Sequence, residues 1–218
     1  MNKEDKKIKE TFNLAFQNHK NANFKIAENL YKEILKKKPN HFESIFYLGG
    51  LSAQMRNFEQ ANKLFQRATQ IRPKDSAAHN NLGSIYKAMG KLQKAVNCYE
   101  KATEINPEYV EAHNNLGITL MESGKHQQAL ECFKKAVQIN PNHLDSNTNL
   151  ANILMEFNHI FEAKKYFEKA LSSDPNKKEA CQGYGRLLLK NNKHFEGLKY
   201  ILKGSGFIRF SEKDFKII

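Results

Sequence analysis

Apolar side chains recur along most of this chain at spacings of three, four and seven residues. That period places side chains on one face of an α-helix, whereas strands would show a period of two. The pattern also repeats as a whole, because all five prolines stand 34 residues apart. They are Pro39, Pro73, Pro107, Pro141 and Pro175. The sequence therefore predicts an all-α array of one supersecondary unit copied along the chain.

Each copy can be numbered so that its proline falls at position 32. The repeats then begin at Ile8, Phe42, Ser76, Val110, Leu144 and Lys178. Positions 8 and 20 are Ala or Gly in every repeat, position 7 is Leu in the first five, starting with Leu14, and position 24 is Tyr or Phe in the same five. Small residues let two helices cross closely, and we expect the leucines and aromatic residues to fill the space beside the crossing.

Two further columns mark where the helices end. Position 15 holds Gly90, Gly124, Asn158 and Asn192, and these residue types tolerate the left-handed conformation that ends a helix. Proline ends the second helix, because it disfavours helix in the residue before it and lacks a backbone donor. Each repeat is therefore predicted to be a pair of short antiparallel helices.

These columns, with Leu-Gly at positions 7 and 8, Ala at 20 and 27, an aromatic residue at 24 and Pro at 32, resemble the tetratricopeptide repeat family over residues 8–204. The resemblance implies an α-solenoid, a right-handed superhelix of about six repeats whose first helices line a concave groove. Repeat one departs from the pattern with Ile34 at position 27. Position 4, often Trp in the family, departs throughout. It reads Thr11, Ile45, His79, His113, Asn147 and Cys181.

The domain organisation follows from the array. We expect the repeats to occupy residues 1–203 and a tail to occupy residues 204–218, set off by Gly204 and Gly206. The tail is apolar for a terminus. Either it covers the last exposed helix, since an array must close its open hydrophobic end, or it docks another chain.

Charge leaves several classes of partner open. The 218 residues include 35 Lys+Arg and 23 Asp+Glu, a formal net charge of +12. The cations fall largely on the second helices, and several follow a Glu by four residues, as in Glu28/Lys32, Glu59/Lys63 and Glu131/Lys135, a spacing typical of a solvated face. Nucleic-acid binding is a less favoured alternative, because exposed aromatic residues interleaved with cations are missing.

The sequence contains no pattern typical of an enzyme. None of its eight histidines stands at ligand spacing from another His or a Cys, and we expect His79 and His113 to pack between helices. We predict no catalytic residues, no metal and no cofactor. Three cysteines, the absence of an apolar leader and the absence of a membrane-spanning run favour a cytoplasmic protein.

The first helices carry an unexpected column of amides. Position 6 reads Asn13, Tyr47, Asn81, Asn115 and Asn149, and position 5 adds Asn80 and Asn114. Asn is less favourable than Ala in a helix interior by about half a kcal/mol, so its repetition needs a reason. A primary amide offers donors and an acceptor at once, which matches the backbone of an extended peptide.

This column resembles the asparagine ladder in the tetratricopeptide superhelix of O-linked N-acetylglucosamine transferases. The resemblance implies peptide contacts by Asn81, Asn115 and Asn149, with Asn13 beyond the Tyr47 interruption. The alternative is that the amides bond to neighbouring repeats and bind nothing. A carboxylate clamp of the chaperone-binding kind is excluded, because Asp145 and Asn149 stand where it needs cations.

We therefore expect a non-catalytic scaffold or adaptor that binds a protein or peptide in its groove. Two alternatives remain at this point. The chain could be the substrate-recruiting arm of a larger enzyme such as a glycosyltransferase, or it could be a basic nucleic-acid-binding protein.

Overall fold

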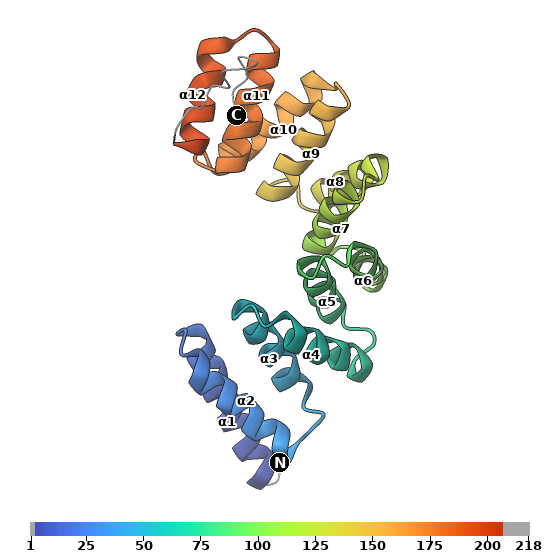
Figure 1. Ribbon diagram of the computed structural model, residues 1–218, viewed down its shortest axis with the longest axis vertical. Coiled ribbons are helices and arrows are strands. Elements are labelled where there is room, and N and C mark those ends of the chain that lie inside the picture. Colours follow the sequence, from blue (N-terminus) through green and yellow to red (C-terminus); the bar gives the residue numbers. More distant parts are fainter. Residues whose placement is uncertain (1–2, 207–218) are drawn as a thin grey trace. The chain divides into compact units, whose positions relative to one another are not determined.

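The computed structural model describes residues 3–206 and folds them into α-helices joined by short turns (Figure 1). No strand occurs in this range, which confirms the all-α class. The first six helices are α1 (Lys3–Lys20), α2 (Phe24–Lys37), α3 (Phe42–Gln54), α4 (Phe58–Ile71), α5 (Ser76–Ala88) and α6 (Leu92–Ile105). The remaining helices are α7 (Val110–Glu122), α8 (His126–Ile139), α9 (Leu144–Glu156), α10 (Ile160–Ser173), α11 (Lys178–Lys190) and α12 (His194–Ser205).

Two compact units make up the chain, residues 1–112 and residues 113–218. In the first unit, α1 packs on α2, α3 on α4 and α5 on α6, and the pairs are joined by packing of α2 on α3 and of α4 on α5. In the second unit, α8 packs on α9, α9 on α10, α10 on α11 and α11 on α12. First helices also touch one another, α1 with α3, α3 with α5 and α9 with α11. Each unit is thus a stack of the predicted helix pairs.

The glycines of position 8 mark the points where the two helices of a pair approach most closely. A Cβ added to Gly83 would lie 2.8 Å from Cε1 of Tyr99, and one added to Gly117 would lie 2.6 Å from Cε1 of Phe133. Both distances are shorter than ordinary carbon–carbon contact. The aromatic ring of position 24 therefore fills the space that the missing side chain leaves, as the columns predict.

The predicted helix ends are confirmed. Gly90, Gly124, Asn158 and Asn192 all have positive φ, between 58° and 74°, and α2, α4, α6, α8 and α10 each end two residues before the proline of their repeat. Ala22 and Arg56 occupy the same position in the first two repeats and also have φ of 59°. Their side chains are unfavourable there, so the sequence pattern did not reveal these two left-handed residues.

The first repeat departs from the column pattern in two places. Leu14, at position 7, is 51% exposed instead of contributing to the core. Ile34, at position 27, is buried, and its position 4 partner is Thr11. Repeat two has the large and small residues the other way round, Ile45 with Ala68. The exchange keeps the volume of the pair similar.

The last helix ends later than the sequence suggests. We expected the array to break at Gly204, but α12 continues through that residue to Ser205 and ends at Gly206, which has φ of +76°. A Cβ on Gly204 would lie 2.8 Å from the carbonyl oxygen of Lys178, so this glycine serves the close packing of α12 on α11. The predicted tail beyond Gly206 lies outside the described residues.

Candidate functional site

The asparagines of position 6 lie on first helices with partly exposed side chains. Asn81 is on α5, Asn115 on α7 and Asn149 on α9. Asn13 on α1 is exposed, and Tyr47 on α3 is half-buried. The helical register therefore places position 6 at the boundary between core and solvent, where part of each amide is accessible.

Position 5 lies deeper in the fold. Asn80 and Asn114 are only 7% and 6% exposed, although the sequence analysis grouped them with the ladder. Consecutive residues differ in direction by about 100° around a helix axis, which is enough to turn position 5 from the surface into the packing between helices. An amide at this depth is placed to contact neighbouring helices.

The second unit shows what a position 5 amide does. Nδ2 of Asn149 donates a hydrogen bond to Oδ1 of Asn114 at 2.9 Å, and Oγ of Ser146 donates to the same oxygen at 3.3 Å. Asn114 is on α7, whereas Ser146 and Asn149 are on α9. The buried amide of one first helix therefore orients the partly exposed amide of the next.

The bond to Asn114 does not use up the capacity of Asn149. A primary amide has two N–H donors and one oxygen acceptor, and this bond takes a single N–H. The other N–H and Oδ1 are left for a ligand. Bonding between repeats and contact with a peptide, which the sequence analysis treated as alternatives, are therefore compatible on one side chain.

Asn81 is in a different situation. The residue at position 5 of the preceding repeat is Phe46, whose ring has no oxygen or nitrogen to accept a hydrogen bond. The side chain of Asn81 makes no hydrogen bond to another residue of the described range 3–206. All donors and the acceptor of this partly exposed amide are thus available to a ligand.

The ladder ends at Gly183 for a steric reason. A Cβ at this position 6 residue would lie 2.5 Å from Cε1 of Phe167 and 2.8 Å from Oδ1 of Asn152. Because α11 contacts α9 here, an asparagine would not fit without moving the helices. Close packing has replaced the amide in the last repeat.

At the N-terminal end of the ladder, Tyr47 belongs to an aromatic cluster. Its ring centroid lies 4.9 Å from that of Phe16, 5.6 Å from that of Phe46 and 5.7 Å from that of Phe12. The sequence analysis singled out Tyr47 and missed the other three rings. The available signal was that position 5 is Phe in the first two repeats and polar in the later four, and that position 9 is Phe in the first repeat alone.

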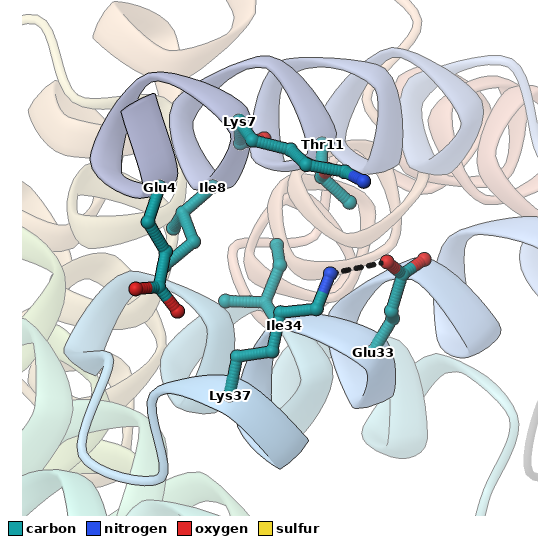
Figure 2. Close-up of a pocket in the computed structure, with 7 residues that line it drawn as sticks. All are labelled: Glu4, Lys7, Ile8, Thr11, Glu33, Ile34 and Lys37. Carbon is teal, nitrogen blue, oxygen red and sulfur yellow. Dashed lines mark hydrogen bonds and ion pairs between the residues drawn. The ribbon is translucent and has the colours of Figure 1, made fainter. Parts of the chain in front are cut away.

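A hollow with a volume of about 350 Å³ lies between α1 and α2 (Figure 2). Ile8, Thr11 and Ile34 provide its apolar surface. Its charged residues are Glu4, Lys7, Glu33 and Lys37, and Nζ of Lys37 pairs with Oε1 of Glu33 at 3.0 Å. This hydrogen bond lowers the pKa of the Glu33 carboxyl. Since Glu33 and Lys37 pair with each other, the hollow offers no set of convergent free polar groups.

The titratable residues of the described range show no clustered chemistry. Residues 3–206 contain no group of three or more His, Cys, Asp or Glu side chains that could hold a metal ion. Cys98, Cys132 and Cys181 form no disulfide within residues 3–206. Burial raises the pKa of Cys98 to about 11 and also raises that of Cys181. A thiol with a raised pKa is mostly protonated at neutral pH and is a weak nucleophile.

Surface cations pair with acids along the second helices. The predicted pair Glu28–Lys32 forms, with Nζ and Oε1 2.6 Å apart, and this hydrogen bond lowers the pKa of Glu28. Glu131 pairs with Lys134 at 3.1 Å instead of the predicted Lys135. Pairs on exposed helix faces contribute only a few tenths of a kcal/mol.

No helix in the described part of the chain is both long and apolar enough to cross a membrane.

Comparison with protein families matches most of the array. Models described as tetratricopeptide repeat match residues 19–85, 110–143 and 144–177, and a model described as TPR repeat matches residues 83–124. The matched segments together run from residue 19 to residue 177. No curated protein matches the chain.

Many solved structures, in contrast, have a fold similar to that of this chain. PilF of Pseudomonas aeruginosa is similar with a TM-score of 0.81 and 17% identity, over 90% of this chain and 89% of that one. MamA is similar with a TM-score of 0.67 and 24% identity, over 74% of this chain and 94% of that one. YrrB, described as a TPR protein with an unusual peptide-binding site, has a TM-score of 0.64 and 18% identity, over 80% and 90% of the two chains.

Proposed function

Because this chain belongs to the tetratricopeptide repeat family, we propose that it is a non-catalytic scaffold that binds an extended segment of a partner protein. The contacts are made by the position 6 amides Asn81, Asn115 and Asn149 on successive first helices. The three cysteines form no disulfide within the described residues, which supports a reducing compartment, the cytoplasm.

The observation that carries this proposal is the hydrogen bond from Asn149 to Asn114. It fixes the direction of a partly exposed amide while leaving a donor and an acceptor unused. Pre-organised groups lose less entropy on binding than mobile ones. An amide that presents N–H and C=O together is complementary to any peptide bond, so binding would tolerate many side-chain sequences.

The peptide-binding site named for YrrB supports the same class of ligand. That structure shares the fold with this chain but only 18% of its residues. Its ligand therefore guides the choice of experiment and does not identify the partner here.

A pull-down from the native lysate tests the proposal, with the retained proteins quantified by mass spectrometry. Wild type is compared with the triple variant Asn81→Ala, Asn115→Ala, Asn149→Ala. The matched control removes three exposed amides from second helices. It is Asn29→Ala, Asn97→Ala, Gln138→Ala. Circular dichroism confirms that all three proteins keep their helices.

We expect the triple variant to lose specific proteins that wild type and control retain. Each net hydrogen bond contributes about 0.5–1.5 kcal/mol, so a purified partner should bind the triple variant at least tenfold more weakly. The same proteins retained by all three versions would contradict the proposal. If the triple variant loses an enzyme together with the substrates of that enzyme, the chain would instead be the substrate-recruiting arm of a larger enzyme. If the protein retains nucleic acid that added salt releases, it would instead be a basic nucleic-acid-binding protein.

A further inference from the structure

The first unit contains a pocket of about 440 Å³ whose walls are largely aromatic. Residues from the end of α1, the start of α2 and the face of α3 line it. They are Phe16, His19, Lys20, Ala22, Phe24, Phe46, Tyr47, Gly50 and Gln54. We call it the aromatic pocket. Its volume falls within the roughly 300–1,000 Å³ typical of ligand sites.

We propose that the aromatic pocket receives an aromatic side chain of the bound segment, next to a carboxylate that pairs with Lys20. This inference rests on the proposed peptide-binding function and adds to it a rule for which peptides bind. The amide ladder holds a backbone of almost any sequence, and the pocket selects one side chain and its acidic neighbour.

The arrangement of the walls favours a ring. Phe16 and Tyr47 meet edge to face, with centroids 4.9 Å apart, and Phe46 meets Tyr47 in the same way at 5.6 Å. Edge-to-face rings present both ring faces and ring edges, which are the partners that another aromatic ring prefers. Buried rings also supply much of the binding free energy at protein interfaces.

The charge of the lining favours an acidic neighbour. Lys20 is exposed, and its Nζ lies 4.7 Å from the ring centroid of Phe16, at the side of the pocket. Within residues 3–206, no carboxylate forms an ion pair with Lys20, and no Asp or Glu lines the pocket. The remaining polar residues are His19 and Gln54, whose Nε2 and Oε1 lie 3.3 Å apart. A ligand carboxylate therefore meets an unpaired cation and no opposing acid.

The position of Tyr47 connects the pocket with the ladder. Tyr47 occupies position 6 of the second repeat, where three of the following four repeats have Asn. At this position, the asparagine that would bind the backbone of the peptide is replaced by Tyr47, whose ring would contact a side chain of the peptide. The exchange occurs beside Gly50, whose missing side chain keeps the pocket open.

Gly50 allows the pocket to be closed without disturbing the fold. A Cβ at this residue would have no heavy atom within 4 Å, other than those of its own helix and chain neighbours. Gly50 also lies inside α3, where most other residues are more favourable than Gly. Gly50→Leu should fill the pocket and preserve stability, and Gly50→Ala is the matched control that leaves most of the space open.

The experiment is selection from a random dodecapeptide phage library on five immobilised proteins. They are wild type, Gly50→Leu, Gly50→Ala, Lys20→Glu and Lys36→Glu. Lys36 is an exposed residue of α2 that does not line the pocket, so its variant controls for the change in net charge. Selected peptides are synthesised, and their affinity for each protein is measured by fluorescence polarisation.

Wild type and both controls should enrich peptides with an aromatic residue next to Asp or Glu. Gly50→Leu should bind these peptides at least tenfold more weakly, and Lys20→Glu should lose the preference for the acid while keeping that for the ring. Peptides without an aromatic residue, or an equal affinity for Gly50→Leu, would overturn the inference. In that case, loss of peptide binding in the Asn81, Asn115, Asn149 triple variant would still uphold the ladder, whereas no enrichment on any protein would overturn both proposals.

Discussion

The imidazole of His79 donates a hydrogen bond from Nε2 to the carbonyl oxygen of Pro73, 3.0 Å away. The same relationship recurs two and three repeats later, in the second unit. Nδ2 of Asn147 donates to the Pro141 carbonyl at 2.9 Å, and Sγ of Cys181 contacts the Pro175 carbonyl at 3.4 Å. In these three repeats, position 4 thus supplies a donor to the carbonyl of the proline that ended the previous helix, which gives a reason for a polar residue there in place of the aromatic residue common in the family.

Replacing His79 tests this role. His79→Phe should lower the free energy of unfolding by about 1 kcal/mol, because the Pro73 carbonyl loses its donor. His79→Asn, which introduces the residue of repeat five, should lose less. Urea denaturation followed by circular dichroism measures both. Equal losses in the two variants would show that packing, and not the hydrogen bond, is what His79 provides.

Two glycines of first helices should respond in opposite directions to the same substitution. Gly117→Ala should destabilise the protein by about 1–3 kcal/mol, because the new Cβ would lie 2.6 Å from Cε1 of Phe133. Gly50→Ala should be neutral or stabilise by up to about 1 kcal/mol, since nothing opposes its Cβ and Ala is the better helix former. Thermal unfolding distinguishes the two, and similar melting temperatures would contradict the crossing geometry.

The left-handed residue Arg56 offers a route to higher stability. Its φ of 59° is unfavourable for a residue with a side chain. Arg56→Gly should therefore stabilise the fold by about 0.5–1 kcal/mol. The reciprocal change, Gly90→Ala, places a Cβ at φ of 72° and should cost about 1 kcal/mol. Denaturant midpoints measure both changes, and a less stable Arg56→Gly would mean that the Arg side chain contributes more than its backbone conformation costs.

Stability should fall in mild acid because of His41. Its Nδ1 accepts a hydrogen bond from the backbone N–H of Ser44 at 3.2 Å and so caps α3. Burial lowers the pKa of His41 below its ordinary value of 6.5, although the nearby Glu43 carboxylate acts in the opposite direction. The unfolded chain therefore takes up the proton first. The stabilisation is complete above pH 6.5 and is lost as the pH falls below it.

The variant His41→Asn isolates this effect, because Asn caps a helix without titrating. Between pH 7.5 and pH 5.5, wild type should lose up to about 1 kcal/mol more than the variant does. Melting temperatures at the two pH values provide the measurement. An identical acid sensitivity in both proteins would assign the pH dependence to other groups.

Phe161 and Phe195 are 93% and 84% exposed, at equivalent positions of repeats five and six. Their turns are adjacent, since Nζ of Lys190 donates to Oδ1 of Asn158 at 3.1 Å. The double change Phe161→Ser, Phe195→Ser should leave the melting temperature almost unchanged, because side chains this exposed contribute little packing. It should clearly reduce retention on a hydrophobic-interaction column. The matched control, Gln93→Ser with Gln127→Ser at the same position, should elute like wild type.

Much of the fold was predictable because its determinants are local. The prolines, the left-handed position at Gly90 and Gly124 and the small residues facing Tyr99 and Phe133 act within one helix pair. Each of them therefore requires a particular residue type at a fixed position of the repeat. Because the repeat occurs several times, these residue types form columns that can be recognised above ordinary sequence variation.

The candidate site was predictable only as a column of residue types. The sequence alone determined that asparagines recur at positions 5 and 6 and that Tyr47 interrupts them. Only the tertiary structure decided that Asn114 is buried while Asn149 reaches the surface and bonds to it. Burial and hydrogen bonding between successive first helices depend on how helices 34 residues apart pack together. No local pattern specifies that packing, and neither the steric end of the ladder at Gly183 nor the opening of the aromatic pocket beside Gly50 could be predicted without it.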